Sequence, residues 1–170
     1  MNDSSAPDPQ AVPLLRGFAP VIADDTHTLI LGSFPGEASL QAQQYYAFRH
    51  NQFWRLLSAV LDAPLADMPY QQRLAHLLAA GIGLWDIFHS CVREGSLDSA
   101  IRDGKLNDFS SLQQTHPQLR RLCFNGKTAG KMQAYFNKNG YQTLVLPSSS
   151  PAHATLRFED KLREWRRLLA

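Results

Sequence analysis

Polar side chains recur at the points where the apolar runs of this chain end. They are Ser33, Asp86, Asn125 and the run Ser148, Ser149 and Ser150. If those runs are strands of one parallel sheet, their carboxyl ends lie along a single edge, where ligands bind in open α/β folds. Hydroxyl, carboxylate and carboxamide groups gathered there could hold a polar substrate by hydrogen bonds. Four clusters at four strand ends favour one site over chance.

Alternating strands and helices must position these groups. Strands are predicted over 28–33, 81–86, 119–124 and 142–146. Helices are predicted over 51–61, 70–80, 108–115, 126–137 and 155–169. Residues 93–107 are predicted to form an insertion after the second strand, with a short helix over 97–102. This alternation indicates an α/β protein whose parallel sheet is covered on both faces. Residues 1–12 are polar and proline-rich and predict a disordered tail, which leaves 13–170 as a single domain.

Composition excludes several classes of protein. The chain has 170 residues, a net charge of +2 and only two cysteines, Cys91 and Cys123, too few for a four-cysteine metal site. The six histidines show no metal-ligand spacing, so we expect no metal and no cofactor. There is no secretory signal and no apolar run that could span a membrane. We therefore expect a soluble cytoplasmic monomer whose charge is compatible with nucleic acid.

Four segments together resemble the uracil-DNA glycosylase superfamily, above all its deoxyinosine (hypoxanthine) DNA glycosylase family. They are GSFPGEASL (32–40), YYAFRHNQFW (45–54), GIGLWDIFHSCVREGSLDSAI (81–101), and FNGKTA with LPSSSPAHA (124–129 and 146–154). The resemblance spans about 28–158. It implies a three-layer α/β/α sandwich with a central four-stranded parallel sheet. It also implies an enzyme that flips a deaminated base, hypoxanthine or uracil, out of DNA and hydrolyses its N-glycosidic bond, leaving an abasic site.

The resemblance assigns the catalytic role to Asn51. Many members of the superfamily carry Asp or Asn, which positions the hydrolytic water, where this chain has Phe34. The deoxyinosine family shares that gap, and an Asn before Phe-Trp takes over the role, here Asn51. A neutral side chain orients water without acting as a strong base, which suits a reaction driven by departure of the leaving group. The alternative is that Asn51 only caps the helix that starts at Gln52.

The base itself would be bound by residues of three segments. Tyr46 matches the stacking aromatic, unless it is a core tyrosine. Asp86 matches the base-reading position and, as a carboxylate, would accept from an N–H but not pair with carbonyl oxygens; alternatively it caps the following turn. Asn125 lies beside the same pocket, and the turn at Ser33 and Phe34 would supply backbone groups and shape.

The second motif would hold the DNA backbone. Ser148, Ser149 and Ser150 would compress it around the target, and Ala152 with His153 would enter the base stack. Lys127 either contacts a phosphate or is solvated. Arg93 either contacts a phosphate or pairs with Glu94 or Asp98. The closing helix is interpreted as having an apolar stripe that faces the core and a basic face that is solvated. The basic face consists of Arg157, Lys161, Arg163, Arg166 and Arg167.

Two other functions fit the same residues. Because Phe34 removes the usual water-orienting group, the chain could be a catalytically weak or silent DNA-binding member of the fold. Alternatively, Ser33 or Ser149 could serve with His153 as the nucleophile of an acyl or phosphate-ester hydrolase.

Overall fold

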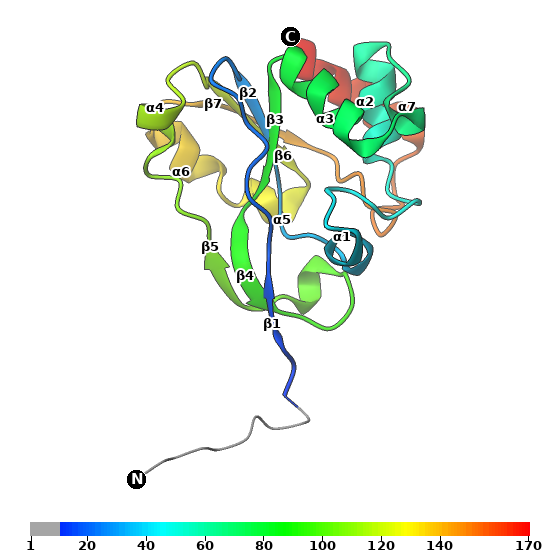
Figure 1. The fold of residues 1–170 in the computed structure, drawn as a ribbon, viewed down its shortest axis with the longest axis vertical. Helices are drawn as coiled ribbons and strands as arrows, with labels where there is room; N and C mark the ends of the chain where they lie inside the picture. The colour runs from blue at the N-terminus through cyan, green and yellow to red at the C-terminus, as the bar shows by residue number, and fades with distance from the viewer. Residues whose placement is uncertain (1–10) are drawn as a thin grey trace.

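A four-stranded parallel sheet forms the centre of the computed structural model, which describes residues 11–170 (Figure 1). The strand order is β3 (Ile82–Asp86), β2 (Thr28–Gly32), β6 (Arg121–Asn125) and β7 (Gln142–Leu146). All three pairings are parallel and continuous, and they end with Gly32 opposite Asp86 and Asn125 opposite Leu146. The four predicted strands are therefore confirmed to within about two residues, and their carboxyl ends meet at one edge. The tail predicted over 1–12 lies outside the described residues except for its last two.

Helices cover both faces of this sheet. Alternate residues of β2 point to opposite sides. Ile30 joins a core with α2 (Phe53–Leu61), α3 (Tyr70–Ala79) and α7 (Phe158–Trp165), whereas Leu29 and Leu31 join a second core with α4 (Leu112–Thr115) and α6 (Gln133–Lys138). Figure 1 shows the two groups of helices on opposite sides of the strands. The three-layer α/β/α sandwich is confirmed.

The ends of α3 show how local sequence sets these elements. The helix begins directly after Pro69, whose fixed φ suits that position. It ends before Gly81, which has a φ of +77°. A Cβ at Gly81 would lie 2.2 Å from His27 Nε2, so both the backbone conformation and the space require glycine. The helix-ending glycine predicted from the sequence is confirmed, and β3 starts at the next residue.

A second, antiparallel sheet was not predicted. Its strands are β1 (Leu14–Arg16), β4 (Phe88–Val92) and β5 (Arg102–Leu106), in the order β1-β4-β5. The helix predicted over 97–102 is wrong, because only Asp98–Ala100 form a 3-10 turn, and β5 begins two residues later. Every residue of β5 is exposed. An edge strand without a buried face shows no alternation of apolar residues, and alternation is the signal by which strands are found.

Smaller differences concern helix lengths. The helix predicted over 126–137 is two helices, α5 (Lys127–Gly130) and α6, and only Leu112–Thr115 of the range 108–115 is helical. A short helix α1 (Glu37–Ala42) follows the Gly-Ser-Phe-Pro-Gly turn, a 3-10 turn occupies Leu65–Asp67, and α7 continues as a 3-10 turn over Arg166–Leu169. None of the helices in residues 11–170 is long and apolar enough to cross a membrane.

Candidate active site

Ser149 is the centre of a hydrogen-bonded network at the carboxyl edge of the sheet. Its hydroxyl donates to Asn51 Oδ1 over 2.8 Å and accepts from Asn125 Nδ2 over 2.9 Å. Its backbone N–H donates to Asn125 Oδ1, also over 2.9 Å. The side chain is fully buried. Ser149, expected to contact the DNA backbone, therefore uses its hydroxyl to join the loop after β7 to the residues before α2.

Asn51 serves both this network and the start of α2. Its Oδ1 also accepts from the backbone N–H of Phe53, the first residue of α2, over 3.0 Å, so the side chain supports the start of that helix although Gln52 is the N-cap residue. A backbone N–H can only donate, which fixes the orientation of the carboxamide. Both lone-pair directions of Oδ1 are then occupied. The amide nitrogen makes no hydrogen bond within residues 11–170, and as a donor it could hold a water molecule without taking its proton.

Tyr46 belongs to the same network through its hydroxyl group. Its hydroxyl oxygen accepts from Asn125 Nδ2 over 3.2 Å. One face of its ring stacks on Phe53, with centroids 3.7 Å apart and an interplanar angle of 13°. A planar ligand would therefore stack on the other face. Tyr46 has a φ of 55°, a strained conformation for an aromatic residue. Strain of this kind is typical of residues that a site holds in place.

Asp86 ends β3 opposite Gly32 and is 4% exposed. A Cβ on Gly32 would stand 2.6 Å from Asp86 Oδ1 and 2.9 Å from Tyr46 Oη, so only glycine lets both oxygens approach this strand end. Burial, with Asp98 as a second cause, raises the pKa of Asp86 to about 7, and Arg93 opposes the shift. The side chain makes no hydrogen bond within the described residues, so the alternative that Asp86 caps the following turn is wrong.

The Gly-Ser-Phe-Pro-Gly turn is held by the loop between β4 and β5. Ser33 Oγ donates to Asp98 Oδ1 over 2.6 Å. Phe34 is buried, and the guanidinium of Arg93 lies over its ring, 5.3 Å from the centroid. Arg93 donates to the backbone oxygens of Pro35 and Gly95. Within residues 11–170 Arg93 makes no ion pair with Glu94 or Asp98, so that predicted pairing is wrong.

Little in the sequence indicates these contacts of Arg93 with backbone oxygens. The residue is 5% exposed, although arginines are seldom fully buried. The useful signal would have been its place directly after β4, but that strand was not predicted. The turn's own backbone retains donors: within residues 11–170, the N–H groups of Ser33 and Phe34 make no backbone hydrogen bond.

The loop after β7 folds back on itself through its serines. Ser148 Oγ accepts from the N–H of Ser150, and Ser150 Oγ accepts from that of Ala152. The N–H of His153 donates to the carbonyl of Ser150. Ala152 is exposed and His153 half-buried, so the tip of this loop is open to a partner.

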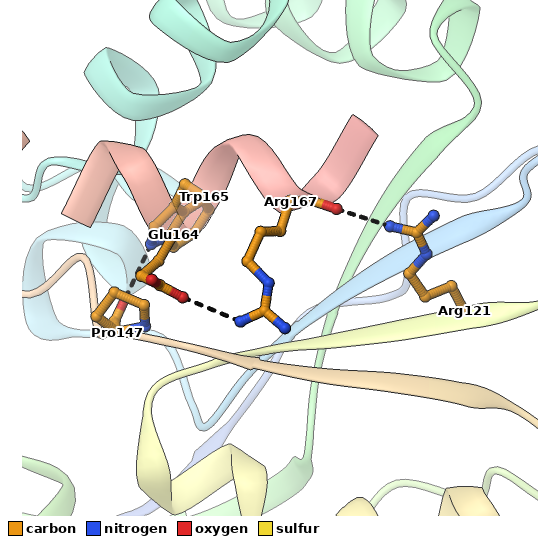
Figure 2. Close-up of polar contacts among 5 residues, drawn as sticks. All are labelled: Arg121, Pro147, Glu164, Trp165 and Arg167. Atoms are coloured by element: carbon orange, nitrogen blue, oxygen red, sulfur yellow. Dashed lines mark hydrogen bonds and ion pairs between the residues drawn. The ribbon is translucent and has the colours of Figure 1, made fainter. Parts of the chain in front are cut away.

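The closing helix anchors this loop through the side chain of Trp165. Trp165 Nε1 donates to the carbonyl of Pro147 over 2.9 Å, as Figure 2 shows. Farther along the same helix, Arg167 pairs with Glu164 over 3.0 Å, and its backbone oxygen accepts from Arg121 (Figure 2). The solvated basic face is confirmed for Arg157 and Arg163, whose side chains are 81% and 76% exposed.

Lys161 departs from that basic face. It is 1% exposed, and its Nζ lies 3.5 Å from the carbonyl oxygen of Ser150. Burial lowers the pKa of Lys161. The pKa of His153 is also lowered, first by burial and then by Lys161 and the exposed Lys127. Lys127 and Lys161 make the second-motif loop locally electropositive, as contact with phosphates requires, whereas the lowered pKa of His153 favours its neutral form.

Other arrangements that the sequence allowed are not formed. The hydroxyl of Ser33 is bonded to Asp98, and that of Ser149 to Asn51, so neither is activated by His153. Within residues 11–170, no group of three or more His, Cys, Asp or Glu residues could hold a metal ion. Two surface hollows, around Arg55 and Phe158 and around Arg120 and Tyr141, lie away from the network. The site is therefore defined by converging polar groups.

A three-layer α/β/α sandwich, with a carboxamide network and a serine loop at the carboxyl edge of its sheet, is the class of protein that the fold and the site define. The model of the uracil DNA glycosylase superfamily matches residues 19–169, and this chain belongs to that superfamily. The resemblance found in the sequence is confirmed. Membership places the chain among the DNA glycosylases of DNA repair.

Relatives from two archaea support the same assignment. A hypoxanthine DNA glycosylase of Methanosarcina acetivorans is 45% identical over 150 residues, covering 88% of this chain and 94% of the relative. One of Methanosarcina barkeri is 44% identical over 138 residues, covering 81% and 87%. A solution NMR structure from M. acetivorans, reported as a candidate uracil DNA glycosylase, is 42% identical. It superposes with a TM-score of 0.83 over 93% of this chain and 100% of that one.

Proposed function

We propose that this protein is a monofunctional DNA glycosylase that removes hypoxanthine, and to a lesser extent uracil, from DNA and leaves an abasic site. The observation that carries the proposal is the chain of hydrogen bonds from Tyr46 through Asn125 and Ser149 to Asn51. It joins the candidate stacking residue to the candidate water-binding residue in one rigid unit. The names of the two archaeal relatives support hypoxanthine as the main substrate.

Each group of the site has a role in this reaction. The flipped base stacks on the free face of Tyr46 and meets Asp86 and the N–H groups of Ser33 and Phe34. The C1′–N bond breaks and leaves its electron pair on the base, while the sugar gains oxocarbenium character. Water held by Asn51 Nδ2 adds to C1′, and its proton balances the charge of the departing base. The loop from Ser148 to His153 binds the flanking phosphates.

Asn125 and Ser149 act in this scheme as positioning residues. The hydrogen bonds of Asn125 to Ser149 and Tyr46 occupy its Nδ2 and its Oδ1, so it holds its neighbours more readily than it contacts the base. Phe34 is buried against Arg93 and gives the turn its shape. The half-buried Asn51, with a free amide donor, favours an active enzyme over a silent DNA-binding protein.

A panel of single-lesion duplexes tests the proposal. Purified protein is incubated with duplexes that contain one deoxyinosine, deoxyuridine, deoxyxanthosine or thymine mismatch, and abasic sites are cleaved with alkali. We expect cleavage at deoxyinosine first, at deoxyuridine more slowly, and the same rates with EDTA. Strand cleavage without alkali would contradict a monofunctional enzyme. Binding of the deoxyinosine duplex without any abasic product would support the silent alternative.

A further inference from the structure

Asp86 is the one buried carboxylate of the site, and its side chain has no ion pair and no hydrogen bond within the described residues. Its Oδ2 is buried without a hydrogen-bond partner. The ion pairs found within residues 11–170 all lie on the closing helix, so none involves Asp86. An ionised carboxylate in such a place loses its hydration and gains no partner, which disfavours the ionised form.

The charged groups around Asp86 do not change this. Arg93, which follows β4, donates from Nε and Nη2 to the backbone oxygens of Gly95 and Pro35, and its buried Nη1 has no partner and makes no ion pair with Asp86. Asp98, from the 3-10 turn, carries a like charge and accepts from Ser33. Tyr45 and Tyr46 lie near enough for the charge of Asp86 to raise their own pKa values, after burial as the main cause. Arg93 therefore lowers the pKa of Asp86, while Asp98 raises it.

The carboxyl group nevertheless faces the place where the base is proposed to lie. Asp86 Oδ1 and Tyr46 Oη approach the same point above Gly32. The Tyr46 oxygen belongs to the hydrogen-bonded network, and the face of its ring opposite Phe53 is the proposed stacking surface. A base stacked there presents its polar edge to Asp86. The group that reads the base is therefore also the group whose ionised form is least stable in this fold.

Deamination products share one chemical feature at that edge. Hypoxanthine presents N1–H beside C6=O, and uracil presents N3–H beside C4=O, so each needs an acceptor next to a donor. A carboxylate offers only acceptors, whereas a carboxylic acid offers one of each. Resting on the proposed function, we propose that Asp86 meets the flipped base as a neutral carboxylic acid, accepting from the ring N–H and donating its own proton to the adjacent carbonyl.

This state also suits the chemical step. When the C1′–N bond breaks, its electron pair makes the base anionic, and an O–H donor at the carbonyl stabilises that charge. An ionised Asp86 would repel it. Asp86 keeps its proton throughout, and the proton that the base finally takes up comes from the attacking water. The raised pKa of Asp86, about 7, is consistent with this state, because the acid then predominates below that pH and is lost above it.

The pH dependence of cleavage tests the inference. kcat/KM on the deoxyinosine duplex is measured from pH 5.5 to 9 for the wild type, for Asp86→Asn, which keeps a donor beside an acceptor but cannot ionise, and for Asp24→Asn, the same change at an exposed turn. We expect wild-type activity to fall about tenfold per pH unit once Asp86 ionises. The ratio of Asp86→Asn to wild type should rise by the same factor, and Asp24→Asn should follow the wild type.

The outcomes separate this inference from the proposed function. If wild-type activity stays level to pH 9, or if Asp86→Asn falls with pH in parallel with it, the neutral acid is wrong. A carbon NMR titration of the Asp86 carboxyl, assigned by its absence in Asp86→Asn, needs no activity; a midpoint near the ordinary value of 3.8 would overturn the inference by itself. A folded wild-type protein that is inactive at every pH would instead overturn the proposed function.

Discussion

The oxygen of Asn51 accepts two hydrogen bonds, one from Ser149 and one from the first turn of α2, and the amide nitrogen remains as a donor. A single side chain therefore fixes a helix, joins two loops and presents one N–H group to the site. The two hypotheses for this residue, capping and catalysis, do not exclude each other. The helix needs the oxygen, and the proposed reaction needs the nitrogen.

Replacing Asn51 with alanine separates the two roles. Loss of the cap should lower the free energy of unfolding by about 1 kcal/mol. Loss of the water-binding donor should lower kcat on the deoxyinosine duplex by about 100-fold or more. Single-turnover kinetics and urea unfolding measure the two effects.

Asp108→Ala is the matched control for the cap. Asp108 is exposed, and its Oδ1 accepts from the N–H of Ser110 in the turn before α4. The variant should lose a similar free energy of unfolding and keep wild-type kcat. Wild-type kcat in Asn51→Ala would reduce Asn51 to a helix cap.

At the scale of elements, two parts of the molecule hold the site from outside the central sheet. The loop between β4 and β5 makes three side-chain contacts with the turn after β2: Ser33 with Asp98, Arg93 with Pro35, and Ser96 with the N–H of Glu37. The closing helix holds the loop after β7 through Trp165 and Lys161. Each motif loop thus has its own support.

Arg93→Met removes the support of the first motif. Methionine keeps an apolar stem against Phe34 but leaves the buried carbonyl oxygen of Pro35, and that of the exposed Gly95, without this donor. We expect the free energy of unfolding to fall by about 2–4 kcal/mol. Urea unfolding measures it. Arg102→Met, on the exposed strand β5, should change it by less than about 0.5 kcal/mol. Equal stabilities of the two variants would show that the Arg93 contacts are not needed.

The sequence predicts the strands of the central parallel sheet and misses those of the antiparallel sheet. The strand β2 is apolar and buried on both faces, so its run Thr28–Leu31 is visible in the sequence. β5 (RDGKL) has no buried residue, and β1 has three residues, so their pairing depends on partners distant in the chain. Likewise, the order of polar residues predicts the edge at which they meet. It cannot predict that Ser149 is buried or that Lys161 turns inward.

At the scale of the whole molecule, Asp86 makes stability depend on pH. Its pKa is raised from 3.8 to about 7 in the folded state, so between these values the folded protein holds a proton that the unfolded chain has released. Stability from this group is complete below pH 3.8 and is lost as pH rises toward 7. The slope is at most about 1.4 kcal/mol per pH unit.

Comparison with Asp86→Asn isolates this contribution, since the other titrating groups are common to both proteins. The free energy of unfolding of the variant minus that of the wild type should rise from pH 4 to pH 7 and level off above it. Chemical unfolding at a series of pH values measures the difference. A difference that does not change with pH would mean that Asp86 titrates alike in the folded and unfolded chains.

The strand β1 lies outside the part of the chain that defines the superfamily, since Leu14–Arg16 precede the matched residues 19–169. It pairs with Ser90, Cys91 and Val92, directly before Arg93. A shortened chain that starts at residue 19 would keep every motif residue and still expose one edge of β4. When this protein is trimmed or fused for expression, the useful boundary therefore lies before β1, and a tag is best separated from Leu14 by several residues.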